Sequence, residues 1–219
     1  MRKAAFLCVV VIAAGFVSSA HAAPIASLNK PAAIFSAPNL HTWTRTVLPL
    51  RTPLSQQRTS VPVLKQRRGW LRVLLPGRPN GHAAWIRAST ARIWSTPWRI
   101  VIRTASRRLF VLRDNRIVRS FPVVVGKSST PTPRGRFFVE EALTLPRGSL
   151  GSPVAYALSA RSNVFQEFDG GPGQIAIHGT YGIGGTPGLA ESHGCIRMTT
   201  DALDWMIRRL GTGTPVEIT

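Results

Sequence analysis

One short segment of the sequence holds most of the side chains that could do chemistry. It reads Ser192-His193-Gly194-Cys195-Ile196-Arg197-Met198 and lies between a glycine-rich stretch and a predicted helix. Cysteine attacks as the thiolate, and a free thiol has a pKa of about 8.5, so a base must take its proton. Histidine is the usual base near neutral pH. The segment therefore predicts a nucleophilic cysteine assisted by a histidine.

Two histidines are candidates for this base. His193 precedes Cys195 by two residues, so on an extended segment both side chains would point to the same face. His178 lies upstream, at the end of a strand predicted over residues 174–178. Either imidazole could reach the thiol in three dimensions, and spacing alone does not choose between them.

The neighbours of the cysteine also fit acyl transfer. Gly194 would let a substrate carbonyl approach the backbone, where the N–H groups of Gly194 and Cys195 could hold an oxyanion. Arg197 could clamp a carboxylate with two hydrogen bonds. Taken singly, a lone cysteine is more often buried than catalytic, but the crowding within seven residues favours a site. A zinc site is an alternative, although the paired spacing of a structural zinc site is missing.

The start of the chain predicts a signal peptide over residues 1–22. Arg2 and Lys3 precede an uncharged apolar run, and Ala20-His21-Ala22 is a small-x-small cleavage pattern. An uncleaved membrane anchor is the second interpretation, but the run is short for a span of about 20 residues. We therefore expect an exported protein of the cell wall, periplasm or extracellular space. Removal of Cys8 would leave Cys195 as the single cysteine, without a disulfide framework.

The charge of the chain is large and unevenly placed. The formal net charge is +19, and residues 24–96 carry Lys and Arg but no Asp or Glu. An exported basic module suits an anionic cell-wall polymer, although an arginine-rich genome is an alternative source of the charge. Nucleic acid would also attract basic residues, but the export signal argues against such a partner.

The remaining sequence divides into three parts. Residues 23–44 are rich in Pro, Ala, Ser and Asn, and predict a linker or disordered arm. Residues 45–96 hold short strand-like runs separated by Gly and Pro, which predicts a small β module. Residues 97–219 predict a mainly β domain with one amphipathic helix, capped by Thr200 or Asp201 and ended by Gly211.

At this point a family resemblance emerges. Ile177-His178-Gly179-Thr180 followed by Ser192-His193-Gly194-Cys195-Ile196-Arg197-Met198 resembles the signature of the L,D-transpeptidase catalytic domain of the YkuD type. Further matches are Val125-Gly126-Lys127, Pro131-Thr132-Pro133-Arg134-Gly135-Arg136-Phe137 and Gly213-Thr214-Pro215-Val216, so the resemblance covers residues 97–219. The run from Trp70 to Ile86 is similar to an SH3-like module that precedes some of these domains.

The resemblance implies a fold and a set of roles. The fold would be a β-sandwich-like catalytic domain with one helix in its C-terminal region, preceded by a small SH3-like β-barrel. His178 would be the base, oriented by the backbone of Gly179, with His193 and Gly194 on the oxyanion side. Arg197, Ser192, Thr180 and Tyr181 would bind substrate, and Phe165 would line a flap with Tyr181. No cofactor and no metal are implied.

The implied reaction is acyl transfer on peptidoglycan stem peptides. The cysteine would release D-alanine from a tetrapeptide stem as a thioester forms, and an amine of another stem would complete a 3→3 cross-link. Carbapenem β-lactams would acylate the same thiol. Water as the acceptor would make the protein an L,D-carboxypeptidase, a protein lysine would give wall anchoring, and a non-catalytic wall-binding protein is a further alternative. The third stem residue and the oligomeric state stay open.

Overall fold

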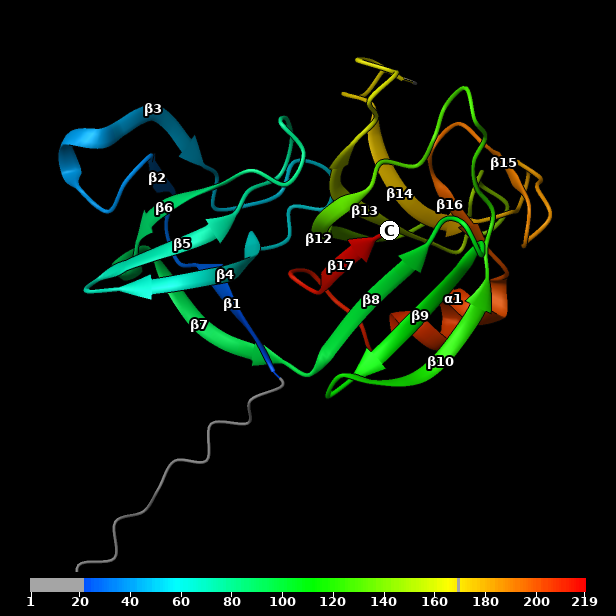
Figure 1. The fold of residues 1–219 in the computed structure, drawn as a ribbon, viewed down its shortest axis with the longest axis horizontal. Coiled ribbons are helices and arrows are strands. Elements are labelled where there is room, and N and C mark those ends of the chain that lie inside the picture. Colours follow the sequence, from blue (N-terminus) through cyan, green and yellow to red (C-terminus); the bar gives the residue numbers. More distant parts are fainter. Residues whose placement is uncertain (1–21, 169) are drawn as a thin grey trace, which may run out of the picture.

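The computed structural model describes residues 22–168 and 170–219, which fold mainly into strands. Two β units lie side by side, with the N-terminal unit at the left of Figure 1 and the unit that carries the C-terminus at the right. The predicted signal peptide falls almost wholly outside the described residues. Within the described part of the chain, no helix has the length and hydropathy needed to cross a membrane.

The N-terminal unit is one antiparallel sheet of seven strands in the order β3-β2-β6-β5-β4-β1-β7. Two short 3₁₀ turns, Leu40–Thr42 and Ala88–Thr90, precede β3 and β7. The strands are β1 (Ala23–Leu28), β2 (Ala32–Phe35), β3 (Trp43–Leu48), β4 (Ser60–Arg67), β5 (Trp70–Leu74), β6 (Ala83–Arg87) and β7 (Ala91–Thr96). The short strand-like runs predicted within residues 45–96 thus include β3 to β6. An SH3-like relationship of this unit stays a prediction.

The prediction of a linker or disordered arm over residues 23–44 was wrong. β1 lies between β4 and β7 and pairs with both, and Ile25, Ala26 and Leu28 are fully buried. These contacts join β1 to residues 60–62 and 91–96. The strand is therefore stabilised by pairing distant in sequence, which the local composition does not reveal.

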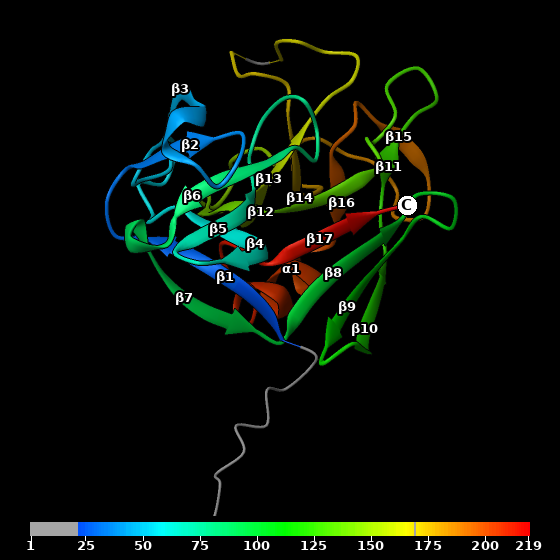
Figure 2. The same ribbon diagram turned by 60° about the vertical axis from the view of Figure 1, so that its left-hand side comes forward.

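The second unit is built on an eight-stranded mixed sheet in the order β10-β9-β8-β17-β12-β13-β14-β16, with β11 and β15 pairing separately (Figure 2). The elements are β8 (Trp98–Arg103), β9 (Arg108–Arg113), β10 (Arg116–Pro122), β11 (Val125–Gly126), β12 (Gly135–Thr144), β13 (Val154–Arg161), β14 (Gln174–Gly179), β15 (Ala190–Ser192), β16 (Ile196–Met198), α1 (Thr200–Ile207) and β17 (Pro215–Ile218). The mainly β fold with a helix near the C-terminus is thereby confirmed.

The helix follows its predicted apolar face but not its predicted ends. Leu203, Met206 and Leu210 are buried in the core of the second unit. The N-cap is Thr199 rather than Thr200 or Asp201, and α1 ends at Ile207, before the predicted stop at Gly211. The segment after Ile207 turns through bonds from residues 209 and 210 to Met206, so the chain leaves the helix a turn earlier than its periodicity indicates.

Strand β12 joins the two hydrophobic cores. Phe137 packs in the core of the second unit, and its neighbour Phe138 packs in the core of the N-terminal unit. Adjacent residues of a strand point to opposite faces, so one strand supplies a side chain to each core. Each of the two phenyl rings is about 1% exposed. The two units therefore share an apolar contact and are packed against each other.

A buried carboxylate fixes the same junction. Glu141, on β12, is fully buried and accepts hydrogen bonds from the backbone N–H of Leu54 and from both the N–H and the hydroxyl of Ser55. Its Oε2 lies 2.6 Å from the Ser55 nitrogen and 2.7 Å from Ser55 Oγ. A buried carboxylate is tolerated when donors satisfy it in this way. The loop before β4 is thus anchored on the second unit.

We predict that Glu141→Ala lowers the free energy of unfolding by about 2–3 kcal/mol, because the substitution removes the hydrogen bonds that Leu54 and Ser55 donate to a buried, charged acceptor. Urea unfolding followed by tryptophan fluorescence measures the change. Glu167→Ala removes an exposed carboxylate and is the matched control. Equal stability of the two variants would contradict the anchoring role.

Candidate active site

The predicted nucleophile and the predicted base meet at one edge of the large sheet. β14 and β16 are parallel neighbours, and His178 pairs with Arg197 in their register. Paired residues of parallel strands point to the same face, as do residues two apart on one strand. His178 and Arg197 therefore share a face, and Cys195 directly precedes β16, although His178 comes from a segment separated from the other two by a long loop. All three line one cleft of about 630 Å³.

The walls of this cleft come from several loops as well as from the sheet edge. Its lining combines apolar and aromatic groups with a few polar ones, as is usual for a small-molecule or peptide site. The lining residues are Leu150, Ser162, Phe165, Phe168, Gly173, Gln174, Ile175, His178, Ile183, Glu191, His193, Cys195 and Arg197.

The imidazole of His178 is held in one orientation by its neighbour. Nδ1 lies 2.8 Å from the carbonyl oxygen of Gly179. A carbonyl can only accept, so Nδ1 donates and Nε2 keeps its lone pair. Burial lowers the pKa of His178, the Gly179 bond acts in the opposite direction, and the charge of Arg197 lowers the pKa further. The ring is therefore neutral at pH 7 and can act as a base.

Gly179 is required by close backbone packing. Its N–H donates to the carbonyl of Gly151 at 2.8 Å, and a Cβ at this position would overlap the carbonyl oxygen of Ser152. Gly151 has a φ of +75° and is itself packed against the His178 ring, because a Cβ there would lie 3.0 Å from Nδ1. Gly151, in the loop before β13, therefore packs closely against the imidazole of His178.

The thiol of Cys195 is protonated at rest. Burial raises its pKa, while a backbone hydrogen bond with Ala176 and the charge of Arg197 act in the opposite direction. Because the pKa of His178 is lowered, the resting pair is a neutral thiol beside a neutral imidazole. Such a pair attacks by passing the thiol proton to the base as the bond to the substrate forms.

In the turn before Cys195, two residues have other contacts than the sequence predicted. Ser192 was predicted to bind substrate, but it is fully buried. Its hydroxyl donates to the Cys195 carbonyl at 2.6 Å and accepts from the Gly194 N–H at 3.1 Å. The N–H of Gly194, at a φ of +119°, is therefore already engaged within the turn and is not a free oxyanion donor.

The loop after β11 supports the same turn. Thr130 Oγ1 donates to the Ser192 carbonyl at 3.1 Å, and Thr132 Oγ1 donates to the Gly194 carbonyl at 2.8 Å. Both threonines are buried. The sequence placed Thr132 within the family-like segment, but its contact with the cysteine turn could not be read from spacing.

Of the other predicted site residues, some line the cleft and some do not. His193 and Arg197 line the cleft; Arg197 Nη1 donates to the Gly184 carbonyl at 3.3 Å, and Arg197 Nε is buried without a hydrogen-bond partner among the described residues. Thr180 and Tyr181 were predicted to bind substrate, but neither lines the cleft. Their carbonyls accept from Gly184 and Gly151, so both residues shape the loop, while the Tyr181 side chain is 56% exposed.

Sequence reasoning missed Gln174 on the floor of the cleft. Gln174 lies on β14 four residues before His178, so the alternation of a strand places both on one face. Its Nε2 donates to the buried carboxylate of Glu140 at 2.9 Å, and Arg161 Nη2 donates to the same oxygen at 3.1 Å. The two-residue period was the signal that could have identified it.

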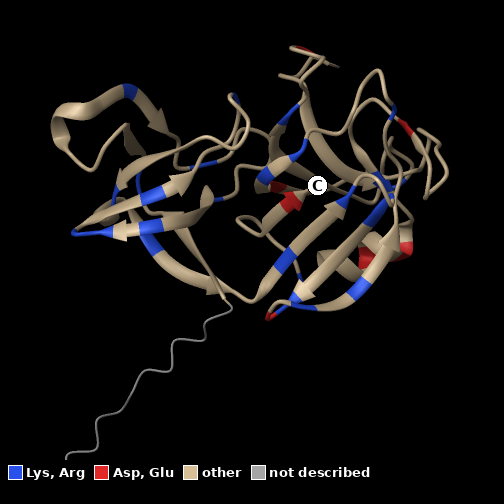
Figure 3. Ribbon diagram, viewed as in Figure 1, with Lys and Arg blue, Asp and Glu red and all other residues tan. Residues whose placement is uncertain are grey.

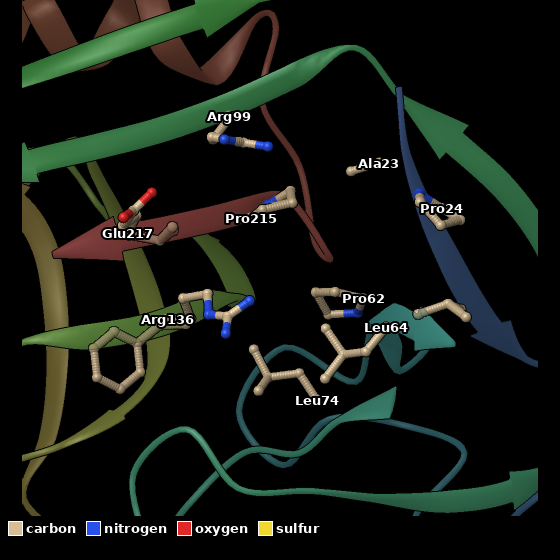
Figure 4. Close-up of a pocket in the computed structure, with 12 residues that line it drawn as sticks. Ala23, Pro24, Pro62, Leu64, Leu74, Arg99, Arg136, Pro215 and Glu217 are labelled. Atoms are coloured by element: carbon tan, nitrogen blue, oxygen red, sulfur yellow. The ribbon is translucent and has the colours of Figure 1, made fainter. Parts of the chain in front are cut away.

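Another cavity, at the junction of the two units, lacks the groups for this chemistry. It measures about 370 Å³ and lies between the N-terminal unit and β17 (Figure 4). Its charged groups are Arg99, Arg136 and Glu217, and no cysteine or histidine lines it. Within the described residues, no cluster of three His, Cys, Asp or Glu side chains forms a metal site.

A comparison of the chain with models of known protein families identifies its family. The model of the L,D-transpeptidase catalytic domain, YkuD, matches residues 97–218, which is more than half of the chain. This protein belongs to the YkuD family of L,D-transpeptidases. The match includes every residue of the His178 and Cys195 segments.

Relatives of this L,D-transpeptidase family member occur in several bacteria. A Bacillus licheniformis protein named for YkuD is 33% identical over 123 residues, which is 56% of this chain and 66% of the relative. L,D-transpeptidase 1 of Mycobacterium tuberculosis is 23% identical over 180 residues, or 68% of this chain and 70% of the relative. The chain thus spans about two thirds of the length of these relatives.

Solved structures of L,D-transpeptidases are also similar. LdtMt1 in complex with imipenem aligns with 74% of this chain and 91% of its own, at 17% identity and a TM-score of 0.47. L,D-transpeptidase 3 from Mycobacterium tuberculosis aligns with 67% of this chain and 79% of its own, at 15% identity and a TM-score of 0.47.

We predict that Gly179→Ala displaces the imidazole of His178 and lowers the free energy of unfolding by about 1–3 kcal/mol, because the added methyl overlaps backbone. Urea unfolding and the rate of Cys195 acylation by a carbapenem measure the two effects. Gly211→Ala is the matched control, since no atom lies within 4 Å of its Cβ position. Unchanged acylation in Gly179→Ala would show that the backbone at residue 179 does not orient the base.

Proposed function

We propose that this protein is a cysteine-dependent L,D-transpeptidase that acts on peptidoglycan stem peptides. One observation carries the proposal: His178 is oriented by the Gly179 carbonyl, with Nε2 free, on the strand that pairs with the Cys195 segment. Membership of the YkuD family supports the reaction class.

In the first half-reaction the cysteine takes the acyl group of the donor stem. The thiol proton moves to His178 Nε2 as Sγ attacks the carbonyl carbon of the third stem residue. The N–H of Cys195 stabilises the oxyanion of the tetrahedral intermediate. The bond to the D-alanine at position four then breaks, the leaving nitrogen takes the proton from the imidazolium, and a thioester remains.

In the second half-reaction an acceptor releases the enzyme. A side-chain amine of another stem's third residue loses a proton to His178 and attacks the thioester, which forms a 3→3 cross-link and restores the thiol. Water in place of the amine gives a tripeptide, the L,D-carboxypeptidase outcome. Arg197, which lines the cleft and donates from Nη1 to the Gly184 carbonyl at 3.3 Å, would bind a stem carboxylate through its remaining terminal N–H groups.

The charge distribution supports an action at the cell wall. In Figure 3, acidic residues are confined to the second unit among the described residues, while basic residues cover both units. A basic N-terminal unit would bind anionic wall polymer and raise the local concentration of substrate. An exported enzyme of this kind fits the predicted signal peptide. Since the relative LdtMt1 was solved with imipenem, we propose carbapenems as acylating inhibitors of Cys195.

Turnover of a disaccharide-tetrapeptide tests this function. We predict loss of D-alanine and a cross-linked dimer with the wild-type protein, no turnover with Cys195→Ala, and a loss of at least about a hundredfold with His178→Ala, the scale of a removed general base. Mass spectrometry measures the products. His41→Ala removes an exposed imidazole and is the control. Tripeptide without dimer would indicate the carboxypeptidase, and full activity in Cys195→Ala would refute the proposal.

The dependence of kcat/KM on pH tests the resting protonation states. His178 must be neutral to take the thiol proton, and its pKa is lowered, so activity should fall only as pH drops through a value below the ordinary 6.5. The pKa of Cys195 is raised, so thiolate formation should contribute only above the ordinary pKa of a free thiol. A broad plateau between these limits is expected. An acid limb centred above pH 6.5 would contradict the burial of the imidazole as a neutral ring.

A further inference from the structure

The N-terminal unit reaches the rim of the catalytic cleft through one loop. Residues 75–82 connect β5 to β6 and sit on the end of β13. The N–H of Gly77 donates to the Ser159 carbonyl at 3.2 Å. The side-chain amide of Asn80 donates to the Arg161 carbonyl at 2.7 Å and accepts from the Arg161 N–H at 2.8 Å. This two-way bond imitates strand pairing and fixes the register of the loop.

Arg78, at the tip of this loop, binds three backbone carbonyls beside the cleft. Its Nη2 donates to Ser162 at 2.9 Å and to Phe165 at 2.8 Å. Its Nη1 donates to Pro172 at 2.9 Å. The planar guanidinium presents several donors in a fixed fork, so it can hold several acceptors at once. We call residues 162–168 the aromatic loop. Through these bonds Arg78 links Ser162 at the start of the aromatic loop, Phe165 in its middle, and Pro172 on the chain that returns to β14.

The aromatic loop forms one wall of the cleft that contains Cys195. The rings of Phe165 and Phe168 lie 5.3 Å apart between centroids, and they lie 6.1 and 5.9 Å from the ring of His193. These three side chains and the thiol line the same cleft. Phe168 remains 49% exposed, so apolar packing alone does not fix this wall.

The chain is closed tightly around the guanidinium. Gly173 has a φ of +64°, and a Cβ there would overlap the Phe165 carbonyl oxygen and lie 3.2 Å from Arg78 Nη2. The Gly173 carbonyl also accepts from the Ser162 N–H at 2.7 Å. The start of the aromatic loop and the chain that returns to β14 thus meet directly beside Arg78.

We propose that Arg78 is a positioning residue of the active site: it holds Phe165 and Phe168 as the wall against which the donor peptide binds. The N-terminal unit then completes the catalytic cleft and does not act only as a tether to the wall. The identity of the donor rests on the proposed function, whereas the clamp itself rests on the contacts of Arg78.

The proposal is tested in the full-length protein with Arg78→Ala and Arg78→Lys. Arg72→Ala is the matched control, because it removes an exposed arginine from β5 in the same unit. In Arg78→Ala, hydrogen exchange of the aromatic loop should become about tenfold faster, since local opening no longer breaks the three bonds. Arg78→Lys keeps the charge but not the fork, so it should restore the exchange rate only in part.

Kinetics separate positioning from a general structural role. In Arg78→Ala, KM for the tetrapeptide donor should rise about five- to tenfold while kcat changes less than about twofold, the pattern of lost substrate binding. Alkylation of Cys195 by iodoacetamide should stay at the wild-type rate, because this small reagent does not need the wall. Arg72→Ala should match the wild-type protein in all three measurements.

Two results would overturn the proposal. One is an Arg78→Ala variant that matches Arg72→Ala in loop exchange and in KM. The other is a parallel fall of donor turnover and iodoacetamide alkylation with lowered thermal stability, which would make Arg78 a fold residue only. If the wild-type protein leaves the tetrapeptide unchanged, the proposed function fails, and loop exchange together with the rate of carbapenem acylation in place of KM still decides the clamp.

Discussion

The parallel pairing of β14 with β16 is the contact on which the site depends. It places His178, the penultimate residue of β14, beside the segment that runs from Cys195 into β16. Two loops support this edge. Gly151 packs closely against the imidazole of His178, and the buried Thr130 and Thr132 donate hydrogen bonds to the turn before Cys195. A displaced edge would separate base and nucleophile without removing either.

The junction between the two units is linked to this edge through β12. Its bulge falls at Glu140, next to Glu141, so two adjacent carboxylates serve different partners. Glu141 anchors the N-terminal unit through Ser55, and Glu140 binds Arg161 and Gln174 toward the cleft. Burial raises the pKa of Glu140, which Arg161 opposes. A buried charge pair of this kind is destabilised by the loss of either partner. A substitution at the junction that displaces β12 should therefore also displace Gln174 in the cleft.

The residues of the candidate site were easier to predict from the sequence than the contacts that support them. A cysteine with its histidines, glycine and arginine forms a local pattern that can be read directly from the sequence. The choice of His178 over His193 needed the family resemblance, because spacing allows both. The role of Ser192, the burial of β1 and the contacts of Arg78 depend on residues far away in the chain. Such contacts leave no trace in local composition, so they could not be predicted.

The central claim is that His178 rests as a neutral ring with its proton on Nδ1 and Nε2 free for the thiol. Nitrogen-15 NMR of histidine-labelled protein at pH 7 tests it most directly, with His178→Gln to assign the signals. We predict a neutral ring protonated on Nδ1, which titrates below the ordinary pKa of 6.5. A proton on Nε2, or an imidazolium beside a thiolate, would contradict the account.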